Sequence, residues 1–322
     1  MHKPLFARRV VFITGKGGVG KTTIASALAV AARERGLRTL LVEVGVTENL
    51  CQIFKKPLPV YEIARIEDGL FALRLDPYLA LKEYLTLNMK VEWAARKFLE
   101  TDVIRYLTQA APGWRELITL GKIWKLQNDR NARDARRPEW DFLVIDAPAT
   151  GHGISFLKVP QIILDTFRYG PIRYQTQEVH KMLLDPARTL LNVVTLPEEM
   201  PMNEAGEIYR AARETLLMPF GYVFVNMMPP ALIDAELATS LTKLESDKKT
   251  RAILDAKLPG GSARLLAAAN HHLARRQLAE QYVHRARARI DAPFVEVPDL
   301  ARPMIDRDAL AVLATHLAGA VE

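Results

Sequence analysis

A glycine-rich turn near the start of the chain constrains the fold more than any other feature. The apolar, β-branched run Val10–Thr14 leads into it, and residues 22–35 follow with apolar side chains at helical spacing. Gly36 then ends the helical pattern, as glycine commonly does just beyond a helix. The turn reads Gly-Lys-Gly-Gly-Val-Gly-Lys-Thr-Thr and fits G-x-x-x-x-G-K-[ST] in its required place between a strand and a helix. This agreement of motif and context argues against the alternative, a chance glycine turn.

The turn has the chemistry of a phosphate-binding loop (P-loop). Its glycines allow successive backbone N–H groups to point inward around an anion, and the following helix adds its positive end. Lys21 is placed to reach the β- and γ-phosphates of a nucleotide, and the Thr22 hydroxyl to ligate Mg²⁺. The residues predicted to hold the nucleotide here are Gly15, Lys16, Gly17, Gly18, Val19, Gly20, Lys21, Thr22 and Thr23.

The rest of the chain repeats the alternation of buried strand and helix. Continuous apolar runs of this kind are typical of strands covered on both faces, so the pattern predicts an α/β fold. We expect a P-loop NTPase with a mostly parallel sheet and helices on both faces. The predicted strands after Val10–Thr14 are Thr39–Val44, Leu70–Leu75 and residues 142–145, 191–196, 222–226 and 294–297.

Two stretches, about 78–131 and 154–190, interrupt this alternation with helical patterns. Apolar positions that mark two of the expected helices are Leu79, Tyr84 and Leu87, and Val103, Leu107 and Ala110. We interpret both stretches as one helical subdomain inserted into the sheet domain. Because no long linker rich in Pro, Gly or Ser occurs, residues 1–322 are expected to form a single domain.

Composition limits the remaining possibilities. The chain is 49% hydrophobic and 25% charged, as expected for a globular protein, and it lacks an apolar run long enough to span a membrane or form a signal peptide. We therefore expect a cytoplasmic protein without an integral membrane segment. The net charge of +7 is partly concentrated on a basic amphipathic helix expected at residues 273–290. Because basic and aromatic residues do not alternate along it and no known nucleic-acid-binding module is present, we interpret it as a surface helix and expect no nucleic-acid partner.

Lys16, directly after the first glycine, narrows the class. A second lysine at this place resembles the loop of the MinD, ParA, nitrogenase-iron-protein and ArsA class of ATPases. The resemblance implies ATP as the nucleotide and a dimer in which Lys16 crosses the interface to the phosphates of the partner subunit. There it would neutralise charge in the manner of an arginine finger. An exposed loop lysine is the plainer alternative.

A second motif points to one branch of this class. Asp146 ends a predicted strand and is followed by Ala-Pro-Ala-Thr-Gly-His, in which the last residue is His152. The run resembles the corresponding segment of the ArsA/Get family, which contains arsenite-pump and tail-anchored-protein-targeting ATPases. The resemblance implies that Asp146 holds Mg²⁺ through water together with Thr22, and that Lys16, Lys21 and Asp146 act in catalysis.

The resemblance extends over nearly the whole chain. Glu198 matches a Pro-Glu segment behind the nucleotide, Asn226 a Val-Asn pair whose amide reads adenine, and Pro298 the start of an adenine loop. These three positions are assigned by order and spacing alone.

The chain departs from the family pattern in three ways. Gly45 stands where the family has the switch I Asp that activates water, and it is open whether Glu43 or Glu48 replaces that Asp. Cys51 is the single cysteine, so neither the metalloid switch nor the zinc clamp of the family can be built, and we expect no zinc and a small buried side chain. The predicted insert is rich in Lys and Arg and poor in Met, which gives no support to a tail-anchor groove.

These patterns predict an ATP-hydrolysing dimeric switch that couples dimer closure to binding or release of a client molecule. The dimer could pair two copies or one copy with a paralogue, and the client is not identified. The alternative is a weakly hydrolysing regulatory or structural subunit, motivated by Gly45. A third reading, a positioning ATPase on membrane or DNA, is weaker because the terminal helix expected at 308–318 carries no lysine.

Overall fold

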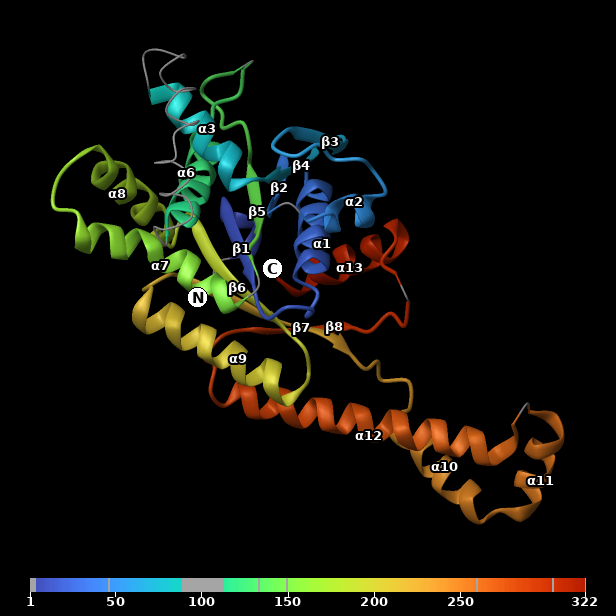
Figure 1. Cartoon of the computed structure of the whole chain (residues 1–322). Coiled ribbons are helices and arrows are strands. Elements are labelled where there is room, and N and C mark those ends of the chain that lie inside the picture. Colours follow the sequence, from blue (N-terminus) through green and yellow to red (C-terminus); the bar gives the residue numbers. More distant parts are fainter. Residues whose placement is uncertain are drawn as a thin grey trace.

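A computed structural model describes residues 4–45, 47–88, 113–132, 134–148, 150–258, 260–302 and 304–321. Within them an eight-stranded sheet has the order β3-β4-β2-β5-β1-β6-β7-β8 (Figure 1). Each described pairing is parallel except that of β3 with β4. The strands are β1 Val10–Thr14, β2 Thr39–Val44, β3 Ile63–Glu67, β4 Leu70–Leu75, β5 Phe142–Asp146, β6 Thr189–Thr195, β7 Phe220–Met228 and β8 Phe294–Pro298.

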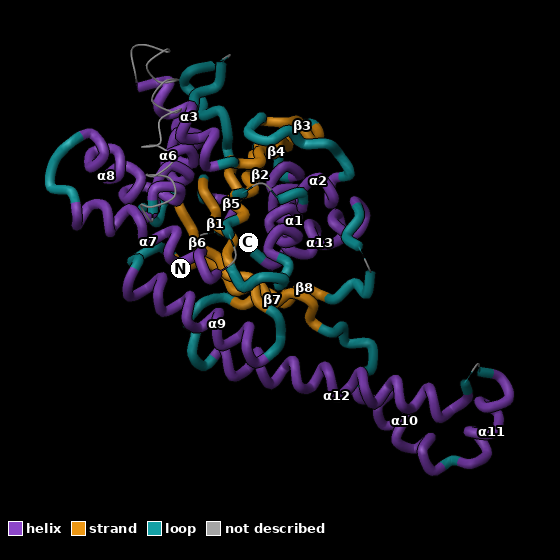
Figure 2. The backbone as a smooth tube through the Cα atoms, viewed as in Figure 1, coloured by secondary structure: helices purple, strands orange, loops and turns teal. Residues whose placement is uncertain are grey.

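Helices cover both faces of the sheet, as Figure 2 shows. The α-helices described are α1 Lys21–Glu34, α2 Asn49–Phe54, α3 Pro77–Asn88, α6 Trp114–Asn128, α7 Thr150–Thr166, α8 Pro171–Leu184, α9 Glu199–Arg210, α10 Ala235–Ser246, α11 Lys248–Lys257, α12 Gly261–Arg287 and α13 Arg307–Ala320. The predicted α/β fold with a mostly parallel sheet and helices on both faces is confirmed.

Two hydrophobic clusters, one on each face, form the core. Successive side chains of a strand point to opposite faces, so Phe12 of β1 joins the cluster with α6, α8 and α9, and Ile13 joins the cluster with α1 and α13. Both side chains are fully buried. Burial on both faces explains why these strands could be recognised as continuous apolar runs.

Strand β3 was not predicted. It is an antiparallel edge strand, its sequence Ile-Ala-Arg-Ile-Glu contains no continuous apolar run, and Ile63 is exposed. An edge strand of this kind buries too little surface to leave a strong apolar pattern. Strands β6 and β7 also begin about two residues earlier than predicted, at Thr189 and Phe220.

The basic helix is longer than the sequence predicts. It begins at Gly261 rather than at residue 273, and its first half forms a projecting arm with α10 and α11 (Figure 1). The second half packs on α9 and β7, in agreement with the surface-helix interpretation. Leu278 is exposed, because the buried side of this part is formed by residues such as Ala279 and Ala286.

Helices α3, α6, α7 and α8 lie together on one side of the sheet (Figure 1). Helix α6 contacts each of the other three. The helix expected around Val103, Leu107 and Ala110 falls outside the described residues.

Candidate nucleotide-binding site

The P-loop leaves the carboxyl end of β1 and enters α1, and two of its glycines are fixed by close neighbours. Gly15 has φ +148°, and a Cβ there would lie 2.2 Å from the carbonyl oxygen of Val194. Gly20 has φ +89°, and a Cβ there would lie 2.2 Å from Asn226 Nδ2. A larger residue would clash with the backbone of β6 at Gly15 and with the Asn226 side chain at Gly20, where the positive φ is also strained for any residue with a Cβ.

Lys21, the first residue of α1, reaches back over the loop. Its Nζ donates a hydrogen bond to the carbonyl oxygen of Lys16 at 2.9 Å. Burial lowers the pKa of Lys21, and the nearby Asp146 carboxylate partly opposes that shift. The ammonium is thus held inside the loop, where a phosphate group would receive it in place of the carbonyl.

Asp146 and Thr22 form the oxygen-rich part of the site. Thr22 Oγ1 donates to Asp146 Oδ2 at 2.6 Å, and the buried Asp146 Oδ1 has no hydrogen-bond partner among the described residues. Burial raises the pKa of Asp146 to about 6, the Glu43 charge adds to this, and Thr22 and Lys21 oppose it. A hydroxyl and a carboxylate with an unused buried oxygen are hard donors of the kind Mg²⁺ prefers, so the residues fit that ion.

Of the two glutamates considered for switch I, only Glu43 lies beside Asp146. Glu43 on β2 and Asp146 on β5 are register partners, and the Glu43 side chain is 2% exposed. Thr47 Oγ1 donates to Glu43 Oε1 at 2.6 Å. Burial raises the Glu43 pKa despite this hydrogen bond and the Arg74 charge. Glu48 is exposed at the start of α2.

Lys16 contacts a residue that the sequence did not mark as part of the site. Its Nζ lies 2.7 Å from Oε1 of Glu204 on α9, with the two side chains 40% and 31% exposed. The partners are 188 positions apart in the sequence. The only signal for this contact was that Glu204 lies on the helix that follows the Pro-Glu segment.

Asn226 supports the loop from β7. Its Nδ2 donates to the carbonyl oxygen of Val19 at 2.9 Å, and the side chain is 6% exposed. Pro298 ends β8 and pairs with Met228, so it lies on the neighbouring strand, and Glu198 immediately precedes α9. Contacts of Asn226, Pro298 and Glu198 with a nucleotide remain predictions, and the His152 side chain is outside the described part.

Comparison with known proteins decides the family. The profile of the family described as Anion-transporting ATPase (ArsA) matches residues 8–170. ATPase BagA of Mycobacterium tuberculosis is 33% identical, over 96% of this chain and 92% of BagA. The chain belongs to the ArsA-type ATPase family. The Arsenical pump-driving ATPase of Escherichia coli is 26% identical, over 78% of this chain and 44% of that longer protein.

Membership of the ArsA-type family, with relatives named as ATPases, supports ATP binding and hydrolysis as the activity of this chain. Among the described residues, no helix combines the length and apolar character needed to cross a bilayer. Cys51 is half-buried rather than fully buried, because it lies on the short surface helix α2 and packs only at the margin of the core.

Proposed function

We propose that this ArsA-type ATPase works as a nucleotide-driven dimeric switch. The observation that carries the proposal is the position of Lys16. The Lys21 ammonium lies inside the P-loop of its own chain, where it donates to the Lys16 carbonyl oxygen. The Lys16 ammonium lies outside the loop, where it is partly exposed and paired with Glu204. A lysine in that position is available to the phosphates of a second subunit once its ion pair opens.

ATP would bind with its phosphates in the nest of residues 15–22 and with Lys21 on the β- and γ-phosphates. Mg²⁺ would be held by Thr22 directly and by Asp146 through water, and when bound it neutralises charge on the phosphates. Glu43 is the better placed of the two candidate residues to orient the attacking water, because it neighbours Asp146.

The four helices α3, α6, α7 and α8 are proposed as the helical subdomain that responds to closure. Their link to the nucleotide site is short, since α7 begins four residues after Asp146. A change in the contacts of Asp146 during the nucleotide cycle would therefore be transmitted to α7 through few intervening residues. The subdomain would convert dimer closure into binding or release of a client molecule.

A second candidate function is a weakly hydrolysing subunit that pairs with a more active paralogue. Gly45 favours it, because the position that supplies the family's switch I carboxylate has no side chain. Turnover by the purified chain separates the two functions. Robust hydrolysis that disappears in Lys21→Ala excludes the weakly hydrolysing subunit.

Light scattering after size exclusion tests the dimer directly. We expect the chain to dimerise with a non-hydrolysable ATP analogue and Mg²⁺ and to be largely monomeric without nucleotide. Lys16→Ala should still bind the analogue but dimerise less. A wild-type chain that stays monomeric with and without the analogue contradicts homodimerisation.

A further inference from the structure

A cavity of about 400 Å³ lies among helices α3, α6 and α8. Its walls are mainly apolar and include Trp114, Leu117, Ile118, Ile172 and Val179. The volume is within the range of about 300–1,000 Å³ typical of small-molecule sites. The cavity is therefore large enough for a ligand with an extended apolar body.

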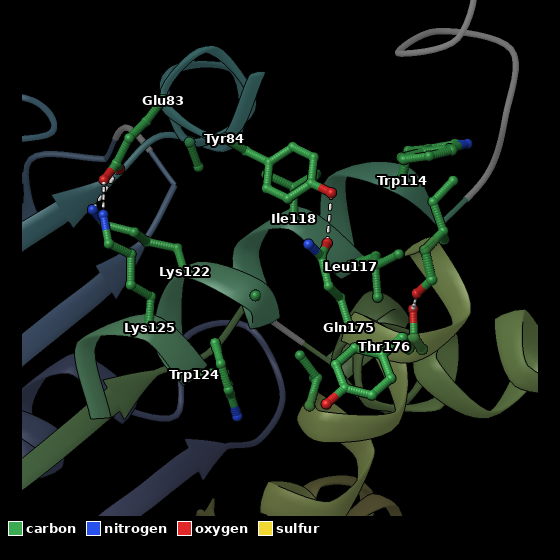
Figure 3. A pocket seen from close by; sticks show the side chains of 15 residues that line it. Glu83, Tyr84, Trp114, Leu117, Ile118, Lys122, Trp124, Lys125, Gln175 and Thr176 are labelled. Carbon is green, nitrogen blue, oxygen red and sulfur yellow. Dashed lines mark hydrogen bonds and ion pairs between the residues drawn. The ribbon is translucent and has the colours of Figure 1, made fainter. Parts of the chain in front are cut away.

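The two ends of this cavity differ in chemistry. Figure 3 shows Glu83, Lys122 and Lys125 together at one end and Trp114 at the other. Lys122 Nζ lies 2.5 Å from Glu83 Oε2, and Lys125 donates to the other oxygen of the same carboxylate. Two ammonium groups therefore share one carboxylate.

That end of the cavity presents two ammonium groups that contact the same carboxylate. Burial alone would raise the pKa of Glu83, but hydrogen bonds from Lys122, Lys125 and Tyr61 outweigh it and lower the pKa to about 2. Glu83 is thus ionised at neutral pH and contacts both lysines, while the Asp129 carboxylate attracts them from further away. Each ammonium has three N–H donors, so both retain donors for a further oxygen ligand.

The middle of the cavity contains polar side chains that are hydrogen-bonded to one another or to the backbone. Tyr84 Oη donates to Gln175 Oε1 at 2.5 Å and thereby joins α3 to α8 across the cavity (Figure 3). The Thr176 hydroxyl is bonded to the Ile172 carbonyl oxygen. The apolar walls and the two ammonium groups at one end therefore favour a ligand with an apolar body and a single anionic end.

We propose that this cavity binds a long-chain carboxylate, with the alkyl chain against the apolar walls and the carboxylate at Lys122 and Lys125. A neutral amphiphile would forgo charge-assisted hydrogen bonds from the two ammonium groups, and a cation would offer them no acceptor. A polyanion would have to bury further charges against apolar side chains. Binding at this cavity can be measured without ATP.

Titration of the full-length chain with dodecanoate tests the proposal. Calorimetry gives the affinity, and Trp114 and Trp124 in the wall allow intrinsic fluorescence as a second readout. We expect saturable binding at one site, and dodecanol should bind about tenfold more weakly because it lacks the charge-assisted hydrogen bonds. Lys125→Met should remove most of that preference, whereas Lys82→Met, an exposed neighbour on α3, should leave it unchanged.

Gly121→Leu provides a test that keeps the protein folded. Gly121 lines the cavity, and an added Cβ there would meet no described heavy atom within 4 Å. Leucine also favours the helix more than glycine does. Gly319→Leu in α13 is the matched control, since its Cβ also enters open space in the described structure. Thermal unfolding establishes that both variants are folded.

We expect Gly121→Leu to weaken dodecanoate binding at least about tenfold by occupying the volume of the alkyl chain, with Gly319→Leu unchanged. The proposal is overturned if the wild-type chain shows no saturable binding or if folded Gly121→Leu binds equally well. Equal affinities for dodecanoate and dodecanol would overturn the recognition of the carboxylate.

Discussion

Lys16 Nζ lies 2.7 Å from Glu204 Oε1, so the lysine expected to serve a second subunit is paired within its own chain. In the proposed dimer, closure would have to break this ion pair before Lys16 could reach a phosphate of the partner subunit. The pair is partly exposed and therefore contributes less than about 1 kcal/mol, which makes it easily opened. An interaction of that size can bias closure without preventing it.

Glu204→Gln should therefore favour nucleotide-dependent dimerisation. Without the competing carboxylate, we expect the dimer to form at about threefold lower protein concentration in the ATP-analogue state. Sedimentation velocity across a concentration series measures the shift. Glu178→Gln, which removes an exposed ion pair with Lys181 elsewhere, is the matched control. A Glu204→Gln chain that dimerises less than wild type would show that Glu204 supports the interface instead.

Asn226→Ala should weaken nucleotide binding in two separable ways. Loss of the hydrogen bond to Val19 loosens the loop and should lower affinity for ATP and GTP alike by about threefold to tenfold. If the amide also reads adenine, ATP should lose more than GTP. Competition binding with both nucleotides measures the difference. Equal losses of affinity for ATP and GTP would show that Asn226 supports the loop without contacting adenine.

Glu43→Gln tests the carboxylate beside Asp146. Glutamine preserves the side-chain shape and can still accept from Thr47, but it removes the charge. We expect the rate of phosphate release to fall at least about tenfold, with ATP affinity little changed, because a general base is lost. Glu48→Gln, at an exposed position, should hydrolyse ATP at the wild-type rate. Equal rates in all three proteins would exclude Glu43 from catalysis.

Glu83 should make folding stability depend on pH. Its folded-state pKa of about 2 lies below the ordinary value of 4.5, so its stabilising effect is full above pH 4.5 and is lost as pH falls toward 2. Glu83→Gln should lower the free energy of unfolding by about 1 kcal/mol at pH 7, allowing for solvent screening.

Urea unfolding from pH 7 down to pH 3 measures this effect. The difference in the free energy of unfolding between wild type and Glu83→Gln should become smaller below pH 4.5. The control Asp68→Asn alters a 97% exposed carboxylate and should change little. A constant difference across the pH range would contradict ion pairing as the cause.

The sequence was informative wherever the fold buries a regular pattern. β1, β2 and β4 begin and end at their predicted residues because each is buried on both faces. Helices α10 and α11 contain no buried residue, so no apolar periodicity marked the projecting arm.

The same distinction holds in the site. Gly15–Lys21 could be recognised because its chemistry is local, with every group on one short turn. The ion pair of Lys16 with Glu204 could not, because it depends on how α9 packs against the loop after the sheet has formed. The ion pairs of Glu83 with Lys122 and Lys125 likewise require α3 and α6 to meet.

Mixing two inactive variants measures most directly whether Lys16 acts across a dimer. In a dimer of Lys16→Ala with Lys21→Ala, the Lys16→Ala chain keeps its own Lys21 and receives Lys16 from its partner. We predict that each variant alone hydrolyses ATP at least about a hundredfold more slowly than wild type, and that an equal mixture recovers up to about a quarter of wild-type activity. A mixture as inactive as each variant alone would contradict the action of Lys16 on the nucleotide bound to the partner subunit.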